Sequence, residues 1–133
     1  MSGPSQTRPS LRTPLGRVLG SGAAKNGVHH WWLQRVTSIA LVPLTLWFVF
    51  ALAGLPSFEQ AEVRAWIASG WTPVWLTLLV LVLCHHSMSG VQVVIEDYVH
   101  GKGLKIASLL AVQFAHGVVA VACVFAIVKV ALS

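Results

Sequence analysis

The stretch "WTPVWLTLLVLVLCHHSMSGVQVVIEDYVHG", residues 71–101, decides the fold class. Its first half is almost wholly apolar, whereas its second half carries histidines, a glutamine, two acids and a tyrosine. Residues 74–95 contain no charge, and about 20 such residues cross a hydrocarbon core of about 30 Å. The stretch therefore predicts a membrane-spanning helix with polar groups concentrated in one half.

Two further uncharged runs, residues 36–55 and 106–128, flank this stretch. Only 10% of the 133 residues are charged, against about a quarter in a soluble domain. We predict an all-α membrane protein with spans at about 34–55, 72–97 and 104–130. Residues 26–133 form the membrane domain. Residues 1–25 contain no acid; this composition overlaps with that of a transit peptide, but we interpret it as a flexible, uncleaved tail.

The basic residues are distributed unevenly among the segments that flank the three spans. Five precede the first span and two separate the second from the third, whereas the 56–73 loop, with a short surface helix expected at 61–68, holds only Arg64. The positive-inside rule then places the N-terminus and the 99–105 loop inside and the C-terminus outside. A net charge of +5 without a basic stripe argues against nucleic-acid binding. Cys84 and Cys123 lie within spans and are predicted to be reduced thiols.

Four residues of the second span share one stripe at about 100° per residue: His86, Gly90, Val93 and Asp97. An unpaired polar group is costly in hydrocarbon, so an intramembrane histidine indicates a functional site. Gly90 leaves space for a macrocycle beside the imidazole, although a small residue also suits close helix packing. His116 of the third span reaches a similar depth, which leaves a bis-histidine haem within one chain open.

The inner ends of the spans carry the other candidate residues. Glu96 and Asp97 oppose the helix macrodipole, which favours cations there. Tyr98 offers a phenolic donor at headgroup depth, or is an aromatic-belt residue. Trp31, Trp32 and Leu33 precede Arg35, so Arg35 needs an anionic partner or must extend to the interface.

Two motifs resemble one known family. The pattern HxxxGxxxxxxDY, formed by His86, Gly90, Asp97 and Tyr98, is similar to the second helix of the small hydrophobic membrane anchor of succinate dehydrogenase, the cytochrome b small subunit of respiratory complex II. "GVHHWWLQRVTSIAL", residues 27–41, resembles the N-terminal signature of that family. The resemblance runs from about residue 21 to the end.

The resemblance implies one half of a heterodimeric helix bundle that binds haem b. His86 would be one axial ligand, with Gly90 packing against the haem. The second ligand would come from a partner, a cytochrome b-type membrane anchor subunit. His29 and Arg35 would lie near the haem propionates at the inner surface. We accordingly expect His86 to face outward, toward the partner.

The family also implies a ubiquinone site and further subunits. Tyr98 would donate a hydrogen bond to a ubiquinone carbonyl oxygen, and Asp97 would order the polar network around it. An iron–sulfur subunit and a flavoprotein subunit would bind on the inner side, so this chain performs no dehydrogenation itself. The expected location is the bacterial inner membrane or, alternatively, the mitochondrial inner membrane. A haem-free structural anchor, a fumarate reductase-type anchor and a small transporter subunit are the rival functions.

Overall fold

Four helices make up the part of the chain that the computed structural model describes, residues 23–133. They are α2 (Ala23–Ala53), α3 (Gln60–Ile67), α4 (Thr72–Tyr98) and α5 (Lys102–Ala131). Three segments are long and apolar enough to cross a membrane: Gly27–Ala53, Thr72–Tyr98 and Lys102–Ala131. The predicted all-α fold with three spans is confirmed.

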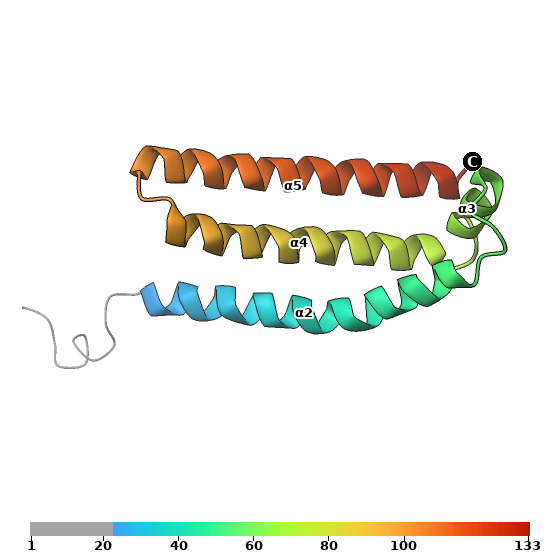
Figure 1. Ribbon diagram of the computed structural model, residues 1–133, viewed down its shortest axis with the longest axis horizontal. Coiled ribbons are helices and arrows are strands. Elements are labelled where there is room, and N and C mark those ends of the chain that lie inside the picture. Colours follow the sequence, from blue (N-terminus) through green and yellow to red (C-terminus); the bar gives the residue numbers. More distant parts are fainter. Residues whose placement is uncertain (1–22) are drawn as a thin grey trace, which may run out of the picture.

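Helix α2 is longer at its N-terminal end than the predicted span. It begins at Ala23 rather than near residue 34, and it continues through Asn26–Gly27, a pair that often forms a turn. Pro43 lies inside the helix, and Figure 1 shows α2 bending in its second half, as the loss of one backbone hydrogen bond allows. The predicted tail falls mostly on residues 1–22, outside the described residues.

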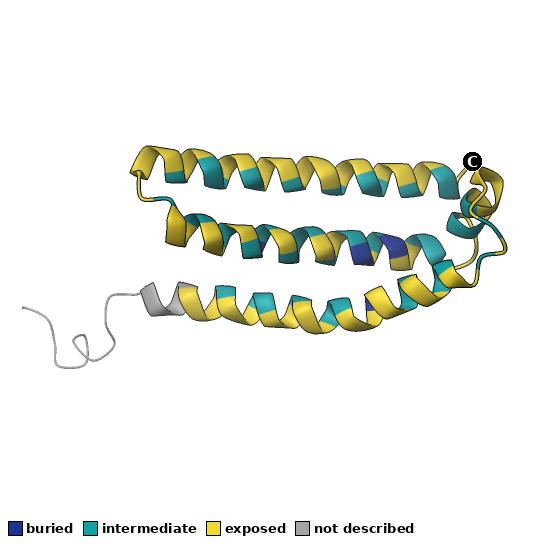
Figure 2. Ribbon diagram, in the orientation of Figure 1, coloured by how far each residue is buried: buried dark blue, intermediate teal, exposed yellow. Residues whose placement is uncertain are grey.

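The three long helices form an open layer. Helix α4 packs against both α2 and α5, whereas the described parts of α2 and α5 make no contact with each other, an arrangement that is visible in Figure 1. Among the described residues only Leu44, Leu76, Leu79 and Ser89 are buried, and three of them belong to α4 (Figure 2). The layer therefore leaves two broad faces uncovered.

An aromatic cluster joins the helices at the end where α3 lies. The predicted surface helix at residues 61–68 is present as α3. The centroid of its Trp66 ring lies 6.3 Å from the ring centroid of Trp47 and 6.3 Å from that of Phe48. Trp47 in turn lies 5.8 Å from Trp75 of α4. Trp66 thus packs against α2 and fastens the 56–71 connection to the layer.

Candidate functional site

The polar stripe of α4 faces α2. Thr37 Oγ1 of α2 lies 3.1 Å from His86 Nδ1. One turn further along, a Cβ placed on Gly90 would lie 3.7 Å from Gln34 Nε2. The two antiparallel helices therefore meet with Thr37 opposite His86 and Gln34 opposite Gly90.

The expected outward orientation of His86 is wrong. The side chain is half-buried and its ring nitrogen is hydrogen-bonded to α2. The periodicity of α4 describes that helix alone and takes no account of α2, which provides a hydroxyl at the same depth. Within the described residues His86 Nε2 has no hydrogen-bond partner, so one ring nitrogen stays free to bind a metal ion.

Two buried polar atoms of α2 lie on the face that meets α4. Gln34 Oε1 and His30 Nε2 are buried and have no hydrogen-bond partner among the described residues. With Thr37, these residues are spaced four and three apart, so they form one helical stripe. Buried polar atoms are almost always paired, so the unpaired atoms indicate that another group belongs beside this face.

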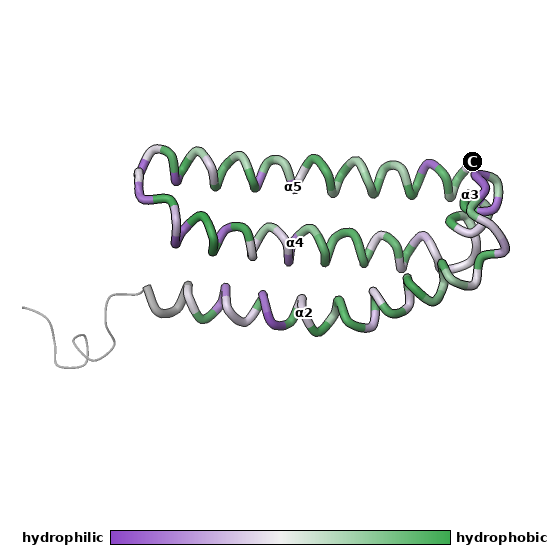
Figure 3. Tube along the Cα trace, in the orientation of Figure 1, coloured by the Kyte–Doolittle hydropathy of each residue, from purple (hydrophilic) through white to green (hydrophobic). Residues whose placement is uncertain are grey.

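A cavity of about 460 Å³ opens between the N-terminal part of α2 and the C-terminal part of α4. His29 and His30 line it from α2, and Gln92 and Glu96 line it from α4. Gln92 Nε2 donates a 2.9 Å hydrogen bond to Glu96 Oε1. Figure 3 shows hydrophilic segments of α2 and α4 gathered in this half of the layer. Gln92 is not among the residues predicted from the sequence, although its spacing of four from Glu96 was a signal.

Arg35 does not join His29 at this cavity. Its guanidinium carbon lies 4.7 Å from the centre of the Trp31 ring, and the side chain is exposed. Arg35 lies six positions after His29, which places the two side chains about 120° apart around α2. In this chain Arg35 forms a cation–π pair with Trp31.

Asp97 and Tyr98 end α4 and are both exposed, Tyr98 by 77%. Neither side chain makes a hydrogen bond within the described residues. Beside them, Lys105 Nζ donates a 2.7 Å hydrogen bond to the backbone oxygen of Glu96. The ammonium group places a positive charge at this helix end, where the macrodipole favours a cation.

His116 has both ring nitrogens occupied. Nδ1 lies 2.8 Å from the Val112 carbonyl oxygen, and Nε2 lies 3.2 Å from Ser87 Oγ. His116 thus bonds α5 to α4, whereas His86 bonds α4 to α2. The two imidazoles are not brought together, and no group of three metal-ligating side chains occurs among the described residues. The adjacent His85 is half-buried, and its Nδ1 has no partner among the described residues.

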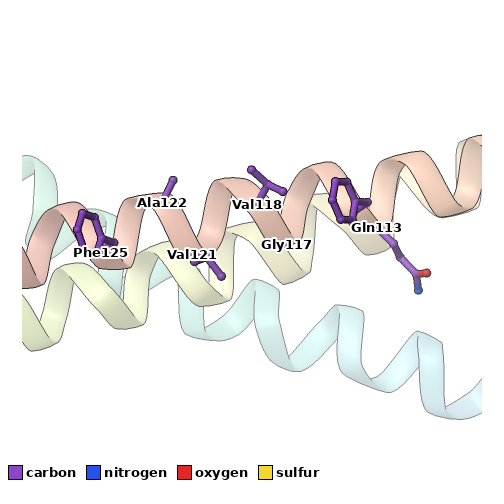
Figure 4. A pocket seen from close by; sticks show the side chains of 7 residues that line it. Gln113, Gly117, Val118, Val121, Ala122 and Phe125 are labelled. Atoms are coloured by element: carbon purple, nitrogen blue, oxygen red, sulfur yellow. The ribbon is translucent and has the colours of Figure 1, made fainter.

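The outer surface of α5 carries an apolar groove of about 710 Å³. Figure 4 shows Phe125, Val121 and Val118 along it, with Gln113 at one end. Phe114 is 76% exposed and Phe125 68%. The groove offers apolar contact area but no ionisable group, so it suits lipid or helix contact rather than chemistry.

The comparisons with known proteins agree with one another. The profile of the family described as "Succinate dehydrogenase/Fumarate reductase transmembrane subunit" matches residues 9–128. A succinate dehydrogenase hydrophobic membrane anchor subunit from Rickettsia bellii is 35% identical over 105 residues, covering 77% of this chain and 82% of the relative. Its counterpart from Paracoccus denitrificans is 30% identical over 120 residues, covering 90% of this chain and 92% of the relative. No solved structure matches. The chain belongs to the family of succinate dehydrogenase/fumarate reductase transmembrane subunits.

Proposed function

We propose that this membrane anchor subunit of succinate dehydrogenase contributes one axial ligand, His86, to a haem b and part of a ubiquinone-reduction site. The second axial ligand comes from a partner anchor subunit. One observation carries the proposal: a half-buried imidazole with a free Nε2 lies beside buried polar atoms that have no partner among the described residues. A helix pair built only for packing would have no need of these groups.

The residues of the α2–α4 face fit a haem. His86 supplies a neutral nitrogen ligand, which haem iron commonly takes from proteins. Gly90 presents no side chain one turn away, and a methyl group there would have room within this chain, so packing against α2 does not itself require a glycine. His29 and His30 line the inner cavity and present donors suited to propionates. When bound, the haem supplies one-electron redox chemistry.

The exposed end of α4 suits a quinone substrate. Tyr98 presents its hydroxyl at the end of the helix. A donor aimed at a quinone carbonyl stabilises the negative charge that develops there during reduction. Asp97 beside it orders the hydrogen-bonding network of the site. The full pocket requires partner subunits, because neither side chain is covered by the described part of this chain.

The shape and charge of the chain suit a place in a larger complex. The open layer leaves faces for a second, haem-ligating anchor subunit. The bias of basic residues toward one side orients the N-terminus and the 99–105 loop inside, the side that binds an iron–sulfur subunit and a flavoprotein subunit. The bacterial inner membrane is the proposed location. A fumarate reductase-type anchor is the second candidate, since the matching family covers both enzymes.

Replacing His86 tests the haem assignment. The complex would be purified in mild detergent from cells expressing His86→Ala or His116→Ala, and haem would be measured by the pyridine haemochrome assay. We expect His86→Ala to lose the low-spin b-type spectrum. His116→Ala should retain it, because both nitrogens of His116 are bound within this chain. Full haem content in the first variant, or its loss only in the second, would contradict the proposal.

A further inference from the structure

The Thr37 hydroxyl contacts three groups at once. Its Oγ1 lies 2.8 Å from the Leu33 carbonyl oxygen and 3.0 Å from the Gln34 carbonyl oxygen of its own helix. The same oxygen lies 3.1 Å from His86 Nδ1 on α4. The two carbonyl contacts are the usual way in which a threonine inside a helix bonds the preceding turn.

The direction of the Thr37–His86 hydrogen bond follows from counting hydrogens. A hydroxyl carries one hydrogen, and a carbonyl oxygen only accepts. The Thr37 hydrogen is therefore committed to the α2 backbone, and its oxygen lone pairs remain for His86. Nδ1 must donate. A neutral imidazole that is protonated on Nδ1 has its lone pair on Nε2, the nitrogen that has no partner among the described residues.

We infer that Thr37 is a positioning residue for haem ligation: it holds His86 in the Nδ1–H tautomer, with Nε2 as the ligand atom. Ligating histidines generally donate their other ring N–H to an oxygen, which fixes the ring and raises its basicity. The oxygen here comes from another transmembrane helix, 49 residues away in the chain. Ring orientation therefore depends on the α2–α4 register. This inference rests on the proposed role of His86.

Helix α2 contains a matched control. Thr45 makes the same backbone contacts as Thr37, with Oγ1 2.6 Å from the Leu41 oxygen and 3.1 Å from the Val42 oxygen. It is exposed and bonds no histidine among the described residues. Thr45→Val removes the same kind of bond from the same helix. A difference between Thr37→Val and Thr45→Val therefore reports the contact with His86.

The test compares Thr37→Val, Thr37→Ser and Thr45→Val in the purified complex. Haem would be counted per covalently or tightly bound flavin, and the reduction potential and the low-temperature EPR spectrum would be measured on the haem that remains. We expect Thr37→Val to weaken haem binding by about 10- to 100-fold, the range for lost outer-shell partners of metal ligands. A less basic imidazole stabilises ferric iron less, so the potential should rise. If the imidazole's preference for ferric over ferrous haem falls tenfold, the reduction potential of this one-electron couple rises by about 59 mV.

Two outcomes separate this inference from the proposed function. Thr37→Ser keeps the hydroxyl, so its haem should have the wild-type reduction potential and EPR spectrum. The haem of the control variant Thr45→Val should also have both. If His86→Ala loses haem but Thr37→Val keeps the wild-type potential and spectrum, the positioning role is overturned and the ligand assignment stands. If His86→Ala itself retains a normal haem, the proposed function fails first. Because potential and spectrum are read on bound haem, a poorly assembling variant still gives a result.

Discussion

Replacing Gly90 with alanine adds one methyl group where α4 approaches α2. The nearest heavy atom to that methyl carbon would be Gln34 Nε2 at 3.7 Å, an ordinary van der Waals distance to the end of a flexible side chain. Alanine is also favoured over glycine inside a helix by about 0.8–1.0 kcal/mol. Within this chain the substitution should therefore be neutral or stabilising by up to about 1 kcal/mol.

Haem binding should respond in the opposite direction. If Gly90 leaves space for the haem beside His86, the methyl group occupies that space and haem content falls. The assay is haem per flavin in the purified complex, combined with thermal unfolding. Gly90→Ala should unfold at a temperature no lower than the haem-free His86→Ala complex. Gly117→Ala is the control, because a Cβ at that mid-helix glycine of α5 meets nothing within 4 Å.

Two results would refute this reasoning. Wild-type haem content in Gly90→Ala would show that the glycine is not needed beside the haem. A complex that assembles worse than the His86→Ala complex would show that Gly90 serves helix packing, against the 3.7 Å clearance.

The remaining predictions concern the C-terminal end of α4, the α4–α5 contact and the orientation of the chain in the membrane. Tyr98→Phe should slow succinate:quinone turnover by less than the roughly 10²–10³-fold typical of a lost oxyanion donor, because partner subunits share the site. Haem content and succinate oxidation by a soluble acceptor should stay unchanged, and wild-type quinone turnover would make Tyr98 a belt residue only. Ser87→Ala removes the hydrogen bond to His116 and should lower the unfolding free energy by about 0.6–1.7 kcal/mol without altering the haem spectrum; a changed spectrum would bring His116 back as a ligand. Reporter fusions should place Lys102 inside and the 56–73 loop outside. An inside signal from that loop would contradict the proposed binding of the soluble subunits on the side of the 99–105 loop.

Much of the architecture could be predicted from local features of the sequence. Charge-free runs of membrane-crossing length predicted three spans, and α2, α4 and α5 contain them. Helical periodicity placed His86 and Gly90 on one stripe, and both do face the same neighbour. The motif around these residues predicted the family that the comparisons confirm. These inferences succeeded because span length, hydropathy and helical phase depend on residues close together in the chain.

The environment of the stripe depended on the tertiary structure. Nothing in the spacing of α4 indicated that α2 covers His86, that Thr37 Oγ1 lies beside its Nδ1, or that Gln34 lies at Gly90. The contact between Thr37 and His86 joins helices through residues 49 positions apart, and the register of two antiparallel helices is set by side-chain packing along their whole length. Periodicity defines which residues share a face of a helix, but only the packed structure determines which helix that face meets and at what depth.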